Sequence, residues 1–169
     1  MKKLNFRKAQ TTDVRGIIDL LNEENIEADF AVAPFNNYEL DEAILKEHIT
    51  ETHNNNLGVI LVCEKDNEII GILDFQRKTT KSMAHCGDFE ILVKKEFTNS
   101  GVGKSIVSYF EAYIKDNTTV QKVNLKVPSD NERAIQMFRE LGFLKEGIRE
   151  KSIFRNGQYL DQILMGKVV

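Results

Sequence analysis

Residues 97–105 read Phe97-Thr98-Asn99-Ser100-Gly101-Val102-Gly103-Lys104-Ser105. This stretch follows a short apolar run, Phe89 to Val93, and opens an amphipathic segment with helical spacing. A strand, a glycine-bearing turn and a helix start together form an anion site. Backbone N–H groups without intrahelical partners and the positive end of the helix dipole point toward such a turn. The stretch therefore predicts a site for a phosphate-bearing ligand.

Two phosphate motifs and one plainer alternative fit these residues. Gly103-Lys104-Ser105 resembles the end of G-x-x-x-x-G-K-[ST], a nucleotide-triphosphate loop, but that motif needs a glycine where the chain has Thr98. Gly101 and Gly103 also fit a pyrophosphate cradle of the form [QR]-x-x-G-x-[GA], with Thr98 again the departure. The third interpretation is an ordinary glycine turn that caps a helix. Short glycine motifs are weak evidence, so the rest of the chain has to decide.

Composition narrows the class of protein. With 169 residues, 41% of them hydrophobic and 29% charged, the chain is expected to form one domain over 1–169. The net charge of −3 gives no general attraction to nucleic acid or an anionic membrane. Cys63 and Cys86 make neither a disulfide framework nor a metal-ligand cluster. No apolar stretch is long enough to span a membrane, and the N-terminus lacks a signal peptide. We expect a cytoplasmic protein without a metal, nucleic-acid or membrane partner.

Hydrophobic periodicity gives the expected order of elements. Helical spacing predicts four helices, near 11–25, 40–52, 102–114 and 131–141. Alternating or apolar runs predict seven strands, near 4–8, 57–64, 69–76, 85–93, 123–127, 144–154 and 159–168. The order β-α-α-β-β-β-α-β-α-β-β indicates an α+β protein with a mixed sheet rather than repeated βαβ units. This order argues against the triphosphate loop, since little chain follows Lys104 and that chain ends in a hairpin.

The same order, with its motifs in place, resembles the GNAT superfamily of N-acetyltransferases over nearly the whole chain. The resemblance is carried by Asp88-Phe89-Glu90-Ile91-Leu92-Val93, by the Gly101-Val102-Gly103 turn, and by the run from Asn131 to Phe143, NERAIQMFRELGF. That run is similar to the family signature N-x-x-A-[IL]-x-x-Y-x-x-x-G-[FY]. Glu146-Gly147 and the segment 155–161, RNGQYLD, are similar to the small-molecule and ribosomal-protein branches.

The resemblance implies a mixed, mostly antiparallel seven-stranded sheet flanked by about four helices, with acetyl-CoA as cosubstrate. Backbone groups of Ile91, Leu92 and Val93 would pair with the pantetheine arm. Asn131 would bond the same arm or the acetyl region. Thr98 stands where the family has Gln or Arg, and Lys94, Lys95 or Lys104 would partly compensate. The diphosphate would lie on the N–H groups of Asn99, Ser100, Gly101, Val102, Gly103 and Lys104.

Phe138 lies in the expected cofactor set at the signature position where the family usually places a tyrosine that protonates the CoA thiolate. Phenylalanine has no hydroxyl and cannot do this. Tyr159, Tyr113 or water would have to donate instead, or the thiolate would leave unassisted, which a thiol pKa near ~8.5 allows.

An ammonium substrate must lose a proton before it attacks a thioester, and a carboxylate can accept that proton. Asp88 and Glu90 lie two residues apart on one expected strand and therefore share a face. We prefer Asp88 as the base, with Glu90 as the alternative. For each of them, a structural carboxylate paired with a lysine is an equally good interpretation.

The acceptor site is the least defined part of the sequence. Phe30, Phe35, Phe75 and His85 are the candidate substrate contacts, although core or loop packing explains the three phenylalanines equally well. A structural role is the preferred interpretation of His85. We expect a small-molecule primary amine, such as an amino acid, a polyamine or an amino-bearing antibiotic. The alternatives are a protein or peptide N-terminus and, because of Thr98 and Phe138, a non-catalytic acyl-CoA-binding module. The resemblance also suggests a homodimer.

Overall fold

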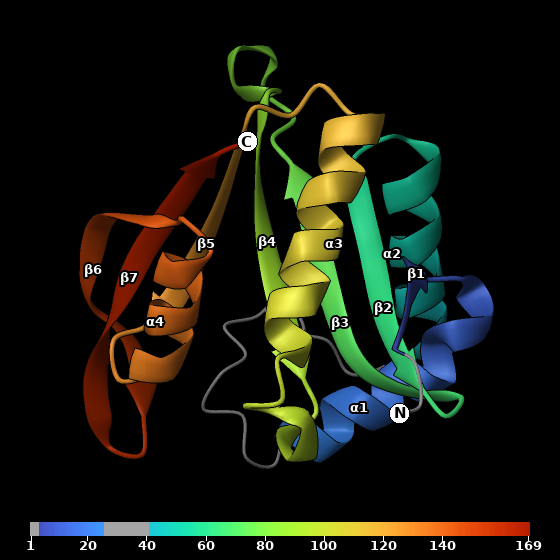
Figure 1. The fold of residues 1–169 in the computed structure, drawn as a ribbon, viewed down its shortest axis with the longest axis horizontal. Coiled ribbons are helices and arrows are strands. Elements are labelled where there is room, and N and C mark those ends of the chain that lie inside the picture. Colours follow the sequence, from blue (N-terminus) through green and yellow to red (C-terminus); the bar gives the residue numbers. More distant parts are fainter. Residues whose placement is uncertain (1–3, 26–40) are drawn as a thin grey trace.

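The computed structural model describes residues 4–25 and 41–169, and within them it shows one seven-stranded sheet (Figure 1). The strand order is β1-β2-β3-β4-β5-β7-β6, and every neighbouring pair is antiparallel except β4 and β5. This confirms the mixed, mostly antiparallel sheet and the element order expected from the sequence. The strands are β1 (Asn5–Lys8), β2 (Gly58–Lys65), β3 (Glu68–Arg77), β4 (Cys86–Val93), β5 (Lys122–Pro128), β6 (Leu144–Arg155) and β7 (Gln158–Val168).

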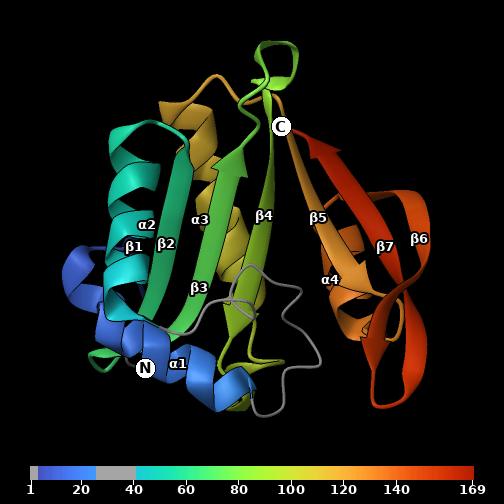
Figure 2. The same ribbon diagram turned by 180° about the vertical axis from the view of Figure 1, so that it is seen from behind.

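Helices cover both faces of the sheet. On the face seen from the front in Figure 1 lies α3, and α1 and α2 cover the opposite face, which Figure 2 shows. Asp41 caps α2 by accepting hydrogen bonds from the N–H groups of Ala43 and Ile44, and Asn131 caps α4 by accepting one from Ala134. In the described residues, none of the helices is long and apolar enough to cross a membrane. The helices are α1 (Val14–Asn25), α2 (Glu42–Asn54), α3 (Val102–Asn117) and α4 (Glu132–Glu140).

A cluster of phenylalanine rings forms the core on the α3 side. The Phe89 ring lies 5.1 Å from the Phe110 ring, 6.0 Å from Phe138 and 5.7 Å from Phe143, measured between ring centroids. Phe110 also packs on Phe75 at 5.0 Å. The edge-on and tilted arrangements are the ones that aromatic rings prefer. Phe89 on β4 thus joins α3 to α4 and the loop that follows it.

Two residues expected at the functional site belong to this core instead. Phe75 is 1% exposed and points to the α3 side, because neighbouring side chains on a strand alternate between faces. It therefore does not contact an acceptor. Phe138 is buried between the Phe89 and Phe143 rings, so it supports the core rather than lining a cofactor site.

Strands β4 and β5 separate after a short ladder. Their parallel pairing covers three residue pairs, from Cys86↔Lys122 to Asp88↔Asn124. Beyond this point β4 continues beside β3 to Val93, while β5 continues beside β7 to Pro128. Figures 1 and 2 show the two strands diverging from the top of the view downward. Within the described part of the chain, the facing edges of β4 and β5 consequently lack a strand partner along their second halves.

We expect Phe110→Ala to lower the free energy of unfolding by about 3–5 kcal/mol, because it removes a fully buried ring that packs on both Phe75 and Phe89. Chemical denaturation measures the loss. Phe154→Ala is the matched control, since its ring is 65% exposed on β6, and it should cost much less. Equal costs for the two variants would contradict this description of the core.

Candidate functional site

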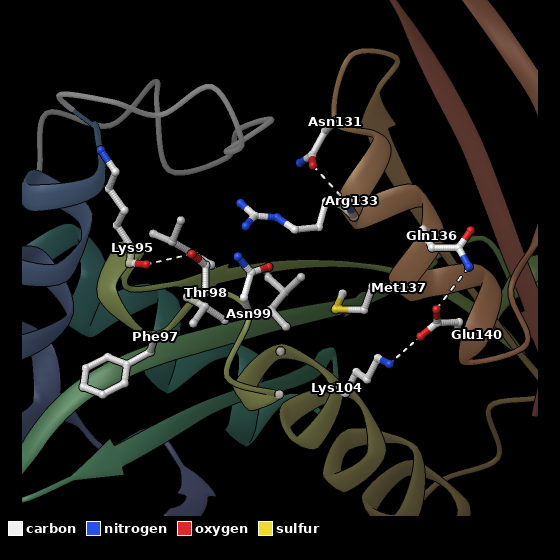
Figure 3. A pocket seen from close by; sticks show the side chains of 16 residues that line it. Lys95, Phe97, Thr98, Asn99, Lys104, Asn131, Arg133, Gln136, Met137 and Glu140 are labelled. Carbon is white, nitrogen blue, oxygen red and sulfur yellow. Dashed lines mark hydrogen bonds and ion pairs between the residues drawn. The ribbon is translucent and has the colours of Figure 1, made fainter.

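A cavity of about 780 Å³ opens where β4 leaves β5 (Figure 3). Its size is in the range of cofactor and small-molecule sites. Three segments that are distant in the sequence form its wall: the end of β4, the turn that leads into α3, and α4. The lining residues are Ile91, Leu92, Val93, Lys95, Phe97, Thr98, Asn99, Gly101, Gly103, Lys104, Asn131, Arg133, Ala134, Gln136, Met137 and Glu140.

The unpaired edge of β4 forms one side of the cavity. Ile91, Leu92 and Val93 are bonded to β3 on one side only, because the β5 ladder ends at Asp88. A strand edge of this kind has free N–H and C=O groups that an extended, amide-bearing ligand can pair with. The structure therefore brings the three residues expected to hold a pantetheine arm to the cavity.

The turn before α3 leaves the start of that helix open. Gly101 has a φ of 84° in the left-handed region, and no described side chain caps the helix. The hydroxyls of Thr98 and Ser100 donate to the carbonyls of Lys95 and Phe97, at 2.7 and 2.5 Å, and so are bonded within the turn. The first N–H groups of α3 thus remain available, which makes this helix start an anion site.

Not every residue of the expected cradle faces the cavity. Asn99, Gly101, Gly103 and Lys104 line it, whereas Val102 is buried in the core and offers the ligand only its backbone. Gly103 lets α3 approach α4 closely at the cavity, because a Cβ at this position would lie 3.2 Å from the Met137 Sδ of α4.

Charged side chains from α3 and α4 meet at the cavity. Lys104 forms an ion pair with Glu140, which also accepts a hydrogen bond of 3.1 Å from Gln136. Lys94, another lysine expected to compensate for Thr98, pairs with Glu68 and Glu96.

Arg133 was not expected from the sequence. Figure 3 shows its side chain extending into the cavity, and it forms no ion pair within the described part of the chain. Arg133 could have been identified from the sequence by its position two residues after Asn131 in the family signature.

The two candidate bases differ in their surroundings. The Asp88 carboxylate forms an ion pair with Lys78 and accepts a hydrogen bond of 3.2 Å from the Asn124 side chain. Glu90 forms neither a hydrogen bond nor an ion pair through its carboxyl group within the described residues. Burial raises the pKa of Glu90 to about 8, and the nearby charge of Asp74 adds to the shift. These contacts therefore favour Glu90 as the base, whereas the sequence favoured Asp88.

Asp74 is a buried carboxylate that sequence reasoning missed. It is 2% exposed and lies directly opposite Glu90 in the β3–β4 ladder. It accepts a hydrogen bond of 2.6 Å from His48 Nε2 and one of 2.5 Å from Gln76 Nε2. The hydrogen bond to Asp74 raises the pKa of His48 above its usual value. Asp74 could have been identified from the sequence, because it is a charged residue inside the apolar run of β3.

The remaining candidates do not meet at the cavity. Tyr159 is 66% exposed and packs on Phe154 at 5.0 Å, so the structure gives no support to its role as the acid. The Tyr113 ring faces Lys8, away from the cavity lining. His85 is exposed just before β4, where its carbonyl accepts hydrogen bonds from the N–H groups of Gln121 and Lys122. Phe30 and Phe35 lie outside the described residues.

A family model described as an acetyltransferase (GNAT) domain matches residues 6–164. The chain belongs to the GNAT acetyltransferases. Curated relatives of the chain include N-acetyltransferases whose names give a substrate. A spermidine N(1)-acetyltransferase of Vibrio cholerae is 24% identical over 159 residues, 94% of this chain and 89% of that protein. An L-amino acid N-acetyltransferase of Escherichia coli is 30% identical over 108 residues, 64% of this chain and 67% of that protein.

Solved GNAT structures share the whole fold. A GNAT-family acetyltransferase from Streptococcus pneumoniae superposes with a TM-score of 0.91 at 22% identity, and the match covers 99% of both chains. A protein from Salmonella typhimurium solved with its cofactor acetyl-CoA gives a TM-score of 0.85 at 15% identity, covering 98% of this chain and 94% of that one. GNAT enzymes use acetyl-CoA as acetyl donor, and the residues of the cavity fit it. The open β4 edge suits the amides of pantetheine, and the uncapped α3 start suits the diphosphate.

We expect Gly101→Ala to weaken acetyl-CoA binding by about tenfold or more, a loss of about 1.4 kcal/mol. An alanine at a φ of 84° is strained by about 1–2 kcal/mol, and relief of that strain would displace the N–H groups at the start of α3. Isothermal titration calorimetry with acetyl-CoA measures the change in affinity.

Gly157→Ala is the matched control for this test. Its φ of 78° is similar, and a Cβ there also meets no atom within 4 Å, but it lies in the turn between β6 and β7. Both variants should lose similar stability, and only Gly101→Ala should lose affinity. An unchanged affinity in Gly101→Ala would contradict the anion site.

Proposed function

We propose that this protein transfers the acetyl group of acetyl-CoA to a primary amine of a small molecule, with Glu90 as the base. The observation that carries the proposal is the position of Glu90. It holds a half-buried carboxyl group on β4 that forms no ion pair with any other residue in 4–25 or 41–169, and it lies immediately before the backbone that lines the donor cavity. A base at this place can reach an amine that approaches the donor from the α1–α2 side of the sheet.

The donor side of the mechanism uses the backbone. In this proposal Ile91 to Val93 pair with the pantetheine amides, and the N–H groups of Asn99 and of Gly101 to Lys104 hold the diphosphate, since the Ser100 N–H donates to the Phe97 carbonyl. Arg133 supplies the cation that the long side chain at position 98 supplies in other family members. Asn131 caps α4 through its Oδ1 atom. This leaves the Nδ2 group of Asn131 to donate a hydrogen bond to acetyl-CoA. Together these contacts fix the thioester for attack.

The chemical step needs one protein group as proton acceptor. Glu90 removes a proton from the ammonium group, and the amine nitrogen then attacks the thioester carbonyl carbon. A C–N bond forms, the C–S bond breaks, and CoA leaves as a thiolate. The nitrogen loses its second proton through solvent, and that proton neutralises the released thiolate. Phe138 cannot protonate that thiolate, because it has no hydroxyl and lies in the core. A thiol pKa near ~8.5 lets the thiolate leave without an acid.

The names of the two curated relatives support a small amine as acceptor, since one acts on spermidine and the other on L-amino acids. The two described cysteines are free, which agrees with a reducing cytoplasmic location. The homodimer stays a prediction.

A panel of amines tests the reaction itself. We expect CoA thiol release with spermidine or an L-amino acid, and little release with the same amines after N-acetylation. Acetyl-CoA at 100 times its Kd should stabilise the fold by about 2.7 kcal/mol, whereas ATP with Mg²⁺ should not. Release only with a peptide bearing a free N-terminus would replace the small-molecule acceptor. Donor binding without release by any amine would identify a non-catalytic acyl-CoA module.

The pH dependence identifies the base. Because Glu90 must be ionised to accept a proton, kcat/KM should rise with pH through about 8. Glu90→Gln should lower kcat/KM by about 10²–10⁴-fold and remove this limb, leaving only the titration of the amine. Asp88→Asn is the matched control on the same strand and face, and it should keep the limb because Asp88 is already paired with Lys78. A limb that survives Glu90→Gln would rule Glu90 out as the base.

A further inference from the structure

Three side chains form a path from α2 to the proposed base, by a hydrogen bond at the first step and by facing positions on two strands at the second. His48 on α2 donates from Nε2 to Asp74 on β3, at 2.6 Å. Asp74 in turn faces Glu90 across the β3–β4 ladder, where their Cα atoms are register partners. Side chains at such positions lie on the same face of the sheet, about 4.5–5.5 Å apart at Cβ. The path therefore ends at the proposed base, although neither His48 nor Asp74 lines the donor cavity.

We propose that His48 and Asp74 are positioning residues for the transfer reaction, and that the charge of this pair controls the ionisation of Glu90. The inference rests on the proposed role of Glu90 as the base. Asp74 is almost fully buried, so its charge is poorly screened by water and acts strongly on its neighbours. When His48 is protonated the pair is neutral overall, and when His48 loses its proton a bare carboxylate faces Glu90.

The geometry fixes Asp74 in this role. Gln76, on the same strand and face, donates to Asp74 Oδ1 at 2.5 Å and to the Thr52 hydroxyl of α2 at 3.2 Å. With His48 on Oδ2, both oxygens of the Asp74 carboxylate are occupied. The carboxylate can therefore neither rotate away from Glu90 nor bind a substrate directly without losing a buried hydrogen bond.

The other charges at this place act in both directions. Burial, Asp74 and Asp88 raise the pKa of Glu90, and Lys126 on β5 lowers it. Around His48, the carboxylates of Asp74 and Glu51 raise the pKa of the imidazole, and burial lowers it. Asp74 acts on both titrations. The ionisations of His48 and Glu90 are therefore coupled through Asp74, and the coupling must be reciprocal.

Two neutral variants change the charge at Asp74 in opposite directions. His48→Gln keeps a hydrogen-bond donor for Asp74 but removes the positive charge, so the rising limb of kcat/KM should move to higher pH. Asp74→Asn removes the negative charge, so the limb should move to lower pH. The two limbs should therefore lie about one pH unit apart, on either side of the wild-type limb, because the two variants differ by one charge at this place. At a pH below the limbs, kcat/KM of His48→Gln should be about tenfold lower than that of Asp74→Asn.

His53→Gln is the matched control. His53 also lies on α2, but its Nε2 accepts a hydrogen bond of 3.2 Å from the Ile60 N–H of β2 rather than contacting Asp74. Burial lowers the pKa of His53, so the ring is neutral over the relevant range and its loss removes no charge. The His53→Gln limb should stay at the wild-type pH even if the melting temperature falls.

Nuclear magnetic resonance of the His48 ring tests the pair without an activity assay. The midpoint of its titration should lie above the usual histidine value in the wild type and return toward it in Asp74→Asn. The wild-type curve should also show a second inflection near pH 8, where Glu90 ionises, and this inflection should be absent in Glu90→Gln.

The outcomes separate the two proposals. Rate limbs that stay in place in both His48→Gln and Asp74→Asn, while Glu90→Gln removes the limb, overturn the positioning role and leave Glu90 as the base. A His48 titration midpoint that is the same in the wild type and in Asp74→Asn likewise overturns the positioning role. A Glu90→Gln enzyme with the wild-type limb instead overturns the proposed function, and the role of the pair with it.

Discussion

The separation of β4 from β5 depends on the packing of one ring, Phe89. Two strands joined by three residue pairs would not hold a fixed angle by hydrogen bonds alone. Phe89 comes directly after the last pair, and its ring contacts Phe110 of α3 on one side and Phe138 and Phe143 on the other. Packing of the buried rings, rather than further ladder hydrogen bonds, therefore fixes the angle between β4 and β5. The rings hold β4 and β5 apart beside the cavity.

The two faces of β4 consequently divide the chemistry. Phe89 and the other side chains on its face of β4 pack toward α3. Asp88 and Glu90 lie on the opposite face, toward α1 and α2. The ligand edge lies between these two faces, in the plane of the sheet. A short strand thus provides core packing, a backbone edge for the donor and a carboxylate for the acceptor. A shift of the register by one residue would exchange the carboxylates with the phenylalanines.

Local patterns in the sequence were sufficient for the element order and the turn before α3. Periodicity, capping residues and glycines act within a few residues, so they can be interpreted without the fold. The pairings at the site are different, since they depend on register between distant segments. Lys78 reaches Asp88 and His48 reaches Asp74 across 10 and 26 residues. For the same reason the sequence left Phe75 and Phe138 at the site, whereas the fold places both in the core.

The ion pair between Lys104 and Glu140 has a kinetic consequence for the donor cavity. A lysine already neutralised by a carboxylate contributes little field beyond the cavity mouth, so long-range attraction of an anionic donor is weak here. Capture then relies on the short-range dipoles of the α3 start and on Arg133. Association should accordingly be slower, and less sensitive to ionic strength, than it would be with an unpaired Lys104.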